Sequence, residues 1–146
     1  MNTVRERIMK MIMNWGYEIE NYYHPSSIIS NKTDIGKGNV FFENVVIQPW
    51  SIIGDGNVFQ ASSILMHDNI VGNYNFFGAG CIVNGRVTIK DDNFIGSNST
   101  IKNKVKIDSY ALIGAGAYVS KDVNSHEVIV PNRSVLLDKN SMEMNI

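Results

Sequence analysis

The residues best suited to chemistry are His67 and Asp68, which are adjacent, and Gly85, which follows His67 by 18 positions within the pair Asn84-Gly85. A histidine can take a proton from an amine or hydroxyl near neutral pH, and a neighbouring carboxylate can orient its ring. A glycine N–H can bind the oxyanion that forms when a thioester carbonyl is attacked. An adjacent His-Asp pair is more often only a solvated surface feature. Whether the His67-Asp68 pair is catalytic therefore depends on whether the fold stacks residues 18 positions apart.

A six-residue repeat predicts such stacking. Beginning at Ile29, every sixth residue is apolar for sixteen consecutive steps, ending at Val119, with no insertion or deletion. This periodicity is typical of a parallel β-helix built from hexapeptides. Three hexads make one coil of 18 residues, and coils stack at about 4.8 Å. We therefore expect an all-β chain of about five coils, in which His67 and Gly85 lie about 5 Å apart.

The first residue of each hexad is expected to point inward, and the fifth to pack at a tight corner. The fifth positions from Asn39 to Val123 contain no aromatic, long or charged side chain. Cys81 occupies one of them and is expected to be a buried filler rather than a nucleophile.

Three segments are expected from the pattern. Residues 1–23 form an N-terminal helix and a strand, 24–131 the β-helix, and 132–146 a polar tail. The helix is expected over residues 3–15 and to end at Gly16. Its apolar side chains share one face: Val4, Ile8, Met11, Ile12 and Trp15.

Composition excludes several classes of function. The net charge is −1 and the isoelectric point is near 6.3, which gives no electrostatic case for binding nucleic acid or a membrane surface. No apolar segment is long enough to span a bilayer, and the N-terminus lacks the apolar core of a signal peptide. These features suit the cytoplasm.

One face of the expected prism carries an apolar column just before the inward residues. Its members are Val40, Val58, Phe76, Phe94 and Leu112. Glycines stand just after the inward residues at positions 78, 96 and 114, so we expect this face to be an interface. A prism with one such flank closes naturally as a homotrimer. The alternative is that the N-terminal helix or the C-terminal tail covers the flank within one chain.

The other candidate residues have weaker cases. His24 is expected to be structural in the turn that leads into the coil, and His126 to be solvated. Some left-handed β-helices, the gamma carbonic anhydrases, bind zinc through three clustered histidines, but the spacing here predicts no metal site. Trp50 stands one coil before Asp68, where it can stack on a sugar ring or pack against the lead-in segment.

Several segments resemble the left-handed β-helix sugar acyltransferases of bacteria. The similar stretches are His24-Pro25-Ser26-Ser27-Ile28-Ile29-Ser30, His67-Asp68-Asn69-Ile70-Val71-Gly72, Gly78-Ala79-Gly80 and Gly85-Arg86-Val87-Thr88-Ile89. The closest subgroup is the sialic-acid O-acetyltransferase and nucleotide-amino-sugar N-acetyltransferase family, and the resemblance runs from about residue 24 to 131.

The resemblance implies a left-handed coil and acetyl-CoA bound in a groove between subunits. It implies that His67 is the general base, that Asp68 raises its basicity, and that Gly85 contacts the thioester. Further positions that it assigns to cofactor binding are Asn84, Phe76, Ser97 and Ala115.

Two departures from the family pattern affect the acceptor. Many members have a second histidine nine residues after the first, where this chain has Phe76. Many also carry an N-terminal nucleotide-sugar-binding domain, of which only a last helix and strand are recognisable between Val4 and Tyr23. We therefore expect either a smaller or carrier-linked acceptor, or a natural start upstream of Met1.

The leading hypothesis is transfer of acetyl from acetyl-CoA to an amine or hydroxyl of a sugar in the synthesis of lipopolysaccharide or capsule. The alternatives are acyl transfer to another small acceptor and a non-catalytic β-helix scaffold. Binding of acetyl-CoA separates an enzyme from a scaffold.

Overall fold

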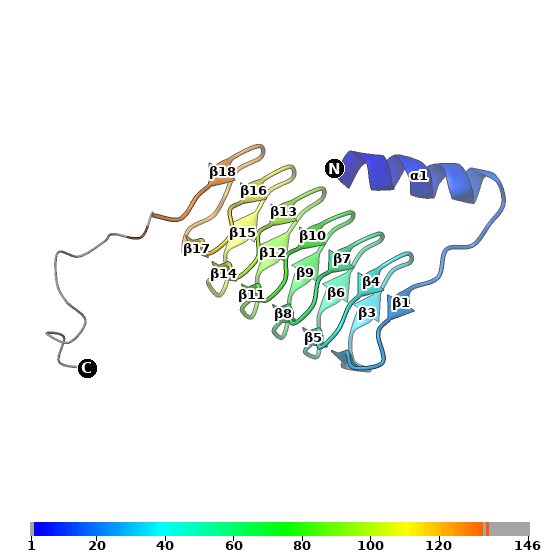
Figure 1. Cartoon of the computed structure of the whole chain (residues 1–146), viewed down its shortest axis with the longest axis horizontal. Coiled ribbons are helices and arrows are strands. Elements are labelled where there is room, and N and C mark those ends of the chain that lie inside the picture. Colours follow the sequence, from blue (N-terminus) through cyan, green and yellow to red (C-terminus); the bar gives the residue numbers. More distant parts are fainter. Residues whose placement is uncertain (1, 133, 135–146) are drawn as a thin grey trace, which may run out of the picture.

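The computed structural model describes residues 2–132 and 134, which form a left-handed parallel β-helix with one N-terminal helix (Figure 1). The expected tail at 132–146 lies outside the described residues except for Asn132 and Ser134. No helix in the described part of the chain is long and apolar enough to cross a bilayer.

The strands are two residues long and form three parallel sheets. Sheet A contains β1 (Tyr22–Tyr23), β4 (Val40–Phe41), β7 (Val58–Phe59), β10 (Phe76–Phe77), β13 (Phe94–Ile95), β16 (Leu112–Ile113) and β18 (Val128–Ile129). Sheet B contains β2 (Ile28–Ile29), β5 (Val46–Ile47), β8 (Ile64–Leu65), β11 (Ile82–Val83), β14 (Thr100–Ile101) and β17 (Tyr118–Val119). Sheet C contains β3 (Asp34–Ile35), β6 (Ile52–Ile53), β9 (Ile70–Val71), β12 (Thr88–Ile89) and β15 (Lys106–Ile107).

Each coil takes one strand from each sheet, so the intervening turns form three corners. The AB corner includes residues 78–81, the BC corner 66–69, and the CA corner 72–75. Paired strands are in register at 18 residues, as in Phe76 opposite Phe94. The six-residue periodicity is therefore confirmed, and β1 and β18 extend the coil beyond the sixteen hexads to about six turns.

The inward column forms the core, as the repeat predicts. Every inward residue from Phe41 to Val119 is at most 3% exposed. The rings of Phe41, Phe59 and Phe77 stack at centroid distances of 5.0 and 4.4 Å, and Tyr23 continues the stack 5.1 Å from Phe41. Stacked aromatic side chains of this size supply much of the buried apolar area.

A ladder of asparagines occupies the fifth position at the CA corner. The backbone N–H groups of Asn57, Asn75 and Asn93 donate to the side-chain oxygen of the asparagine one coil earlier, at 2.8, 2.9 and 2.8 Å. These side chains and that of Asn39 are fully buried. At this corner the fifth-position asparagines therefore add hydrogen bonds between coils to the small size that the turn requires, because buried N–H groups must be paired.

The glycine column beside sheet A has a different cause from the one expected. Gly78 and Gly96 are buried, and a Cβ added to either would lie 2.5 Å from the backbone nitrogen of Ser97 or Ala115 on the next coil. Close approach between coils of one chain therefore requires glycine there. The column is not evidence of an interface, and the prediction of an interface now depends on the apolar side chains alone.

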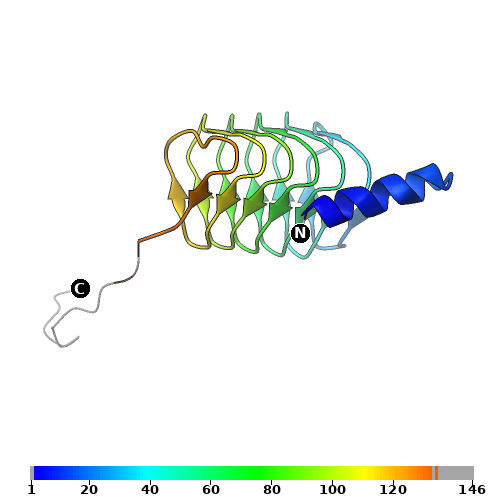
Figure 2. The same cartoon turned by 90° about the horizontal axis from the view of Figure 1, so that it is seen from above.

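Helix α1 (Asn2–Asn14) packs along the CA corner, as Figure 2 shows from above. Arg5 donates to the carbonyl oxygens of Gly56 at 2.7 Å, Tyr74 at 2.6 Å and Asn75 at 3.1 Å. Met9, one turn later, is 7% exposed and lies against Gly56. Burial lowers the pKa of the Arg5 guanidinium, an effect that nearby Asp92 opposes.

The packed side of α1 differs from its most apolar side. Val4, Ile8, Met11 and Trp15 are each more than 40% exposed. An Arg5–Met9 stripe docks the helix instead, because the arginine satisfies carbonyl groups at the turns that it crosses. The helix begins one residue before the expected span and ends one residue earlier than expected.

Cys81 gives a first test of this packing. The side chain is 1% exposed, and burial raises the pKa of its thiol to about 12. The thiolate is the reactive form, so at about pH 8 iodoacetamide should leave Cys81 unmodified in the folded protein and modify it in urea. Mass spectrometry reads out the labelling. Complete modification of the native protein within the same exposure would show that the corner is open.

Candidate active site

The turn at 66–69 holds His67 and Asp68 at the BC corner between β8 and β9. The side-chain nitrogen of Asn69 donates to the Met66 carbonyl at 2.6 Å, and its oxygen accepts from the Val87 N–H at 2.7 Å. Asp68 has a left-handed backbone, with φ of 58°, which Asp and Asn adopt more readily than most residues. The turn is therefore fixed both internally and to the next coil.

His67 and Asp68 form a hydrogen-bonded pair. Their Nδ1 and Oδ2 atoms are 2.7 Å apart, and both side chains are about 40% exposed (41% and 39%). An ionised carboxylate only accepts, so Nδ1 carries the proton and Nε2 keeps its lone pair for another partner. Arg86 adds a cation, with its Nε 3.9 Å from Asp68 Oδ2. The pair can accept a proton at Nε2 and stabilise the resulting imidazolium.

Gly85 lies directly under the imidazole ring. A Cβ at this position would be 2.7 Å from His67 Cε1 and 2.9 Å from Nε2, so a larger residue would displace the ring. The Gly85 N–H donates to no group in the described part of the chain. Beside it, the Asn84 side-chain nitrogen donates to the Ile101 carbonyl at 2.7 Å.

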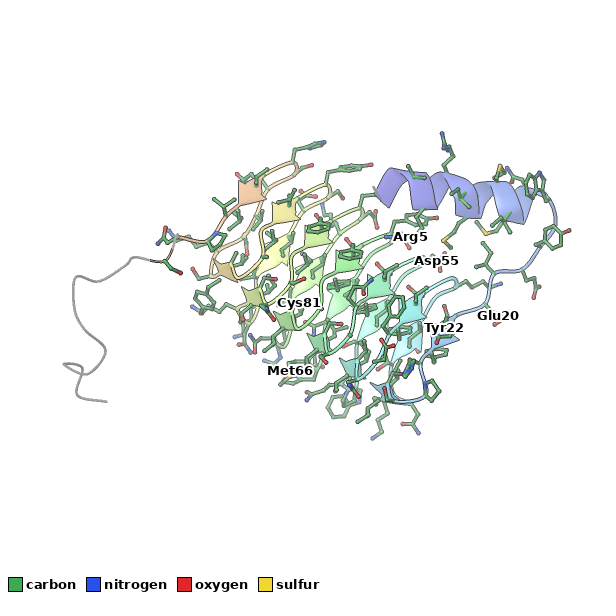
Figure 3. All side chains as sticks on the ribbon, in the orientation of Figure 1. Arg5, Glu20, Tyr22, Asp55, Met66 and Cys81 are labelled. Atoms are coloured by element: carbon green, nitrogen blue, oxygen red, sulfur yellow. The ribbon has the colours of Figure 1, made fainter. Side chains whose placement is uncertain are left out.

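The remaining expected cofactor positions lie elsewhere on the coil. Phe76 is on sheet A, where its ring stacks on Phe94 at 5.0 Å. Ser97 and Ala115 lie one coil apart at the AB corner. One chain therefore brings His67, Asp68, Asn84 and Gly85 together but leaves the other three positions on different surfaces. Figure 3 labels Met66, the residue before His67, and Arg5, which lies beneath α1. The two lie on opposite sides of the coil.

The three histidines occupy three different corners. His24 is at the AB corner, where its Nδ1 is 2.9 Å from Ser26 Oγ. His126 is at the CA corner and stacks on Tyr110 at 5.0 Å. Among the described residues, no three His, Cys, Asp or Glu side chains are grouped as metal ligands.

Sequence reasoning missed one surface feature. The outward positions of sheet B form a second apolar column of Ile28, Val46, Ile64 and Ile82. The signal was present, because each is a β-branched residue directly before an inward one. Two apolar sheet faces therefore meet at the AB corner.

The comparisons with known proteins agree with this architecture. A family model described as bacterial transferase hexapeptide (six repeats) matches residues 86–121. No curated relative aligns significantly with the sequence.

Solved structures match most of the chain. PerB from Caulobacter crescentus, solved in complex with CoA and GDP-perosamine, has a TM-score of 0.86 at 24% identity over 87% of this chain and 61% of that chain. The acetyltransferase domain of PglB from Neisseria gonorrhoeae has a TM-score of 0.86 at 23% identity, with 87% and 62% covered. WeeI from Acinetobacter baumannii has a TM-score of 0.86 at 26% identity, with 93% and 66% covered.

The chain thus spans 61% of PerB and 62% of the PglB domain. The expected resemblance is confirmed: this is a hexapeptide-repeat left-handed β-helix, similar in structure to solved bacterial acetyltransferases that include a GDP-perosamine N-acetyltransferase.

Proposed function

We propose that the protein is an acetyltransferase that moves acetyl from acetyl-CoA to an amine of a nucleotide-linked sugar, with His67 as general base. The observation that carries the proposal is the hydrogen-bonded pair of His67 and Asp68 above an unpaired Gly85 N–H. A scaffold has no need of a buried glycine that leaves space for an imidazole. The solved complex of PerB with CoA and GDP-perosamine supports the choice of donor and acceptor.

His67, Asp68 and Gly85 account for each proton transfer and each developing charge in the reaction. The acceptor nitrogen attacks the thioester carbonyl, and its proton passes to His67 Nε2 while Asp68 stabilises the imidazolium. The Gly85 N–H donates to the developing oxyanion. When the tetrahedral intermediate collapses, the C–S bond breaks, and the CoA sulfur takes the proton from Nε2. The amide product and free CoA then leave with His67 neutral again.

The complete site requires a second copy of the chain. Sheet A and sheet B carry different apolar columns, so a contact of sheet A on one copy with sheet B on the next is heterologous, the kind of contact that forms a ring when its rotation closes. The strands of sheet B lead into the BC corner, where His67 follows β8. This contact brings Phe76 of one copy toward His67 of the other, which accounts for cofactor positions on separate surfaces. We therefore propose a homotrimer with acetyl-CoA in the groove between copies.

The proposed setting is the synthesis of lipopolysaccharide or capsule in the cytoplasm, where acetyl-CoA and nucleotide sugars are made. A single unpaired cysteine suits a reducing compartment. We also propose that the chain divides into residues 1–23, 24–131 and 132–146. Strand β1, within the first segment, pairs with β4 and so belongs to sheet A.

Removal of the base gives the first test of function. His67→Ala should lower kcat by roughly 10²–10⁴-fold and leave the Kd for acetyl-CoA nearly unchanged, because the base acts mainly in the transition state. Asp68→Asn should cost less, since it only orients and tunes the ring. His126→Ala, another exposed histidine, is the matched control. Full activity in His67→Ala would refute the assignment, and failure of the unmodified chain to bind acetyl-CoA would favour a scaffold.

Gly85→Ala tests the contact between the ring and the glycine. The backbone of Gly85 is not left-handed, so alanine is tolerated and the added Cβ acts by displacing the imidazole. We expect kcat to fall by roughly 10–100-fold with the melting temperature nearly unchanged. In a His67→Ala background the same substitution should have little further effect. Additive losses would show that Gly85 acts independently of His67.

The oligomeric state can be tested on both columns. Phe94→Glu on sheet A and Ile82→Glu on sheet B each place a charge in the proposed contact, at a cost on the order of several kcal/mol. Sedimentation velocity should show the unmodified chain as a trimer and both variants as monomers. Thr88→Glu, on the outward side of sheet C, is the control and should remain trimeric. A monomeric unmodified chain would rule the trimer out.

A further inference from the structure

Trp50 occupies the coil next to the dyad at the BC corner. Lys32, Trp50, Asp68 and Arg86 hold the same position in four successive coils. The Trp50 N–H donates to the Lys32 carbonyl at 2.8 Å, and the Asp68 N–H donates to the Pro49 carbonyl at 3.2 Å. The indole is therefore attached one coil, about 4.8 Å, from the acid-base pair.

The fold gains little from this tryptophan. The residue is 61% exposed, so most of the indole faces solvent, as the sugar-stacking alternative requires. Its backbone is left-handed, with φ of 61°, as is that of other corner residues such as Arg86 and Tyr110, so the turn itself does not require a tryptophan. A large exposed aromatic surface one coil from an acid-base pair is better explained by binding than by stability.

A cation stands beside the indole. Lys32 Nζ lies 5.6 Å from the ring centroid, within the range of a cation–π contact. Lys32 is itself exposed, so its ammonium group can reach an anion held next to the ring. Along the corner the order is thus a cation, an aromatic surface and the acid-base pair, with Gly85 beyond.

We propose, resting on the acetyltransferase function above, that Trp50 and Lys32 form the acceptor subsite. The apolar C–H face of a pyranose stacks on the indole, and a phosphate attached to that sugar pairs with Lys32 Nζ. The sugar amine then points along the corner toward His67 Nε2. Acceptor and thioester approach the imidazole from opposite directions, the acceptor from the Trp50 coil and the donor from the Gly85 coil.

This arrangement assigns separate roles to the two residues. Stacking recognises the sugar face and is insensitive to charge, whereas Lys32 recognises the phosphate through charge. Loss of either should weaken binding of the acceptor and leave the donor unaffected. The effect should appear in the acceptor KM, because both contacts are made before the transition state.

Kinetics of three variants test the roles. Trp50→Asn keeps a residue that accepts the left-handed turn and should raise the acceptor KM about tenfold, with the Kd for acetyl-CoA unchanged. Trp50→Tyr should restore most of the loss. Lys32→Gln should raise the KM for a phosphate-bearing acceptor but not for the methyl glycoside of the same amino sugar. Tyr110→Asn is the matched control, since Tyr110 is 48% exposed with φ of 64° at another corner.

Fluorescence gives a readout that needs no turnover. The chain has two tryptophans, so Trp15→Phe leaves Trp50 as the sole indole. The probes are UDP-linked and GDP-linked amino sugars, with free UDP, free GDP and the methyl glycosides as comparisons. We expect a sugar-bearing nucleotide of the panel to quench or shift Trp50 emission more strongly than its free nucleotide.

The outcomes separate the subsite from the function. An unchanged acceptor KM in Trp50→Asn, or unchanged Trp50 emission across the panel, overturns the subsite when acetyl-CoA still binds. Loss of the trimer in Trp50→Asn with an unchanged KM would assign Trp50 to subunit packing and would also overturn it. Failure of the unmodified chain to bind acetyl-CoA would instead overturn the proposed function.

Discussion

The structure depends on hydrogen bonding between coils at a fixed interval of 18 residues. Each two-residue strand is too short to be stable alone, and its N–H and C=O groups are paired only by the coils before and after it. The bonds from Ile52 to Asn69 and from Gly54 to Val71, both 2.8 Å, are typical. This interval places the inward side chains in columns and leaves the outward corner residues, such as His67 and Asp68, accessible to solvent. The core and the candidate active site are therefore consequences of the same register.

The corners reconcile two demands on the chain. A tight turn favours a left-handed residue, and a functional site needs particular side chains there. Asp68 meets both demands, because aspartate tolerates the left-handed backbone and its carboxylate holds His67 Nδ1 at 2.7 Å. Asn69 meets the structural demand from inside the coil by bonding both its own turn and the next. The dyad is thus held by the ordinary hydrogen bonds of the repeat, without a dedicated support.

Much of this arrangement could be predicted from sequence, because periodicity reports directly on register. The inward column, the buried Cys81 and the stacking of His67 over Gly85 all follow from counting in steps of six and 18. Other features depend on detail that periodicity does not contain. The docking of α1 through Arg5 and Met9 reflects where turn carbonyl groups accept bonds, and the glycines at 78 and 96 reflect the distance between coils. The apolar column on sheet B could have been predicted from the sequence, but only by comparing the outward residues of all three faces.

The uniform backbone of the corners has an evolutionary consequence. An outward corner position can change its side chain without changing the path of the chain, because the hydrogen bonds that hold each turn come from the main chain and from buried residues such as Asn69. Outward residues along the BC corner can therefore vary with little effect on the core, although neighbours in contact, such as His67 and Gly85, must change together. A β-helix of this kind can acquire a new substrate by a few substitutions at fixed intervals, while its folding and its chemistry at His67 stay the same.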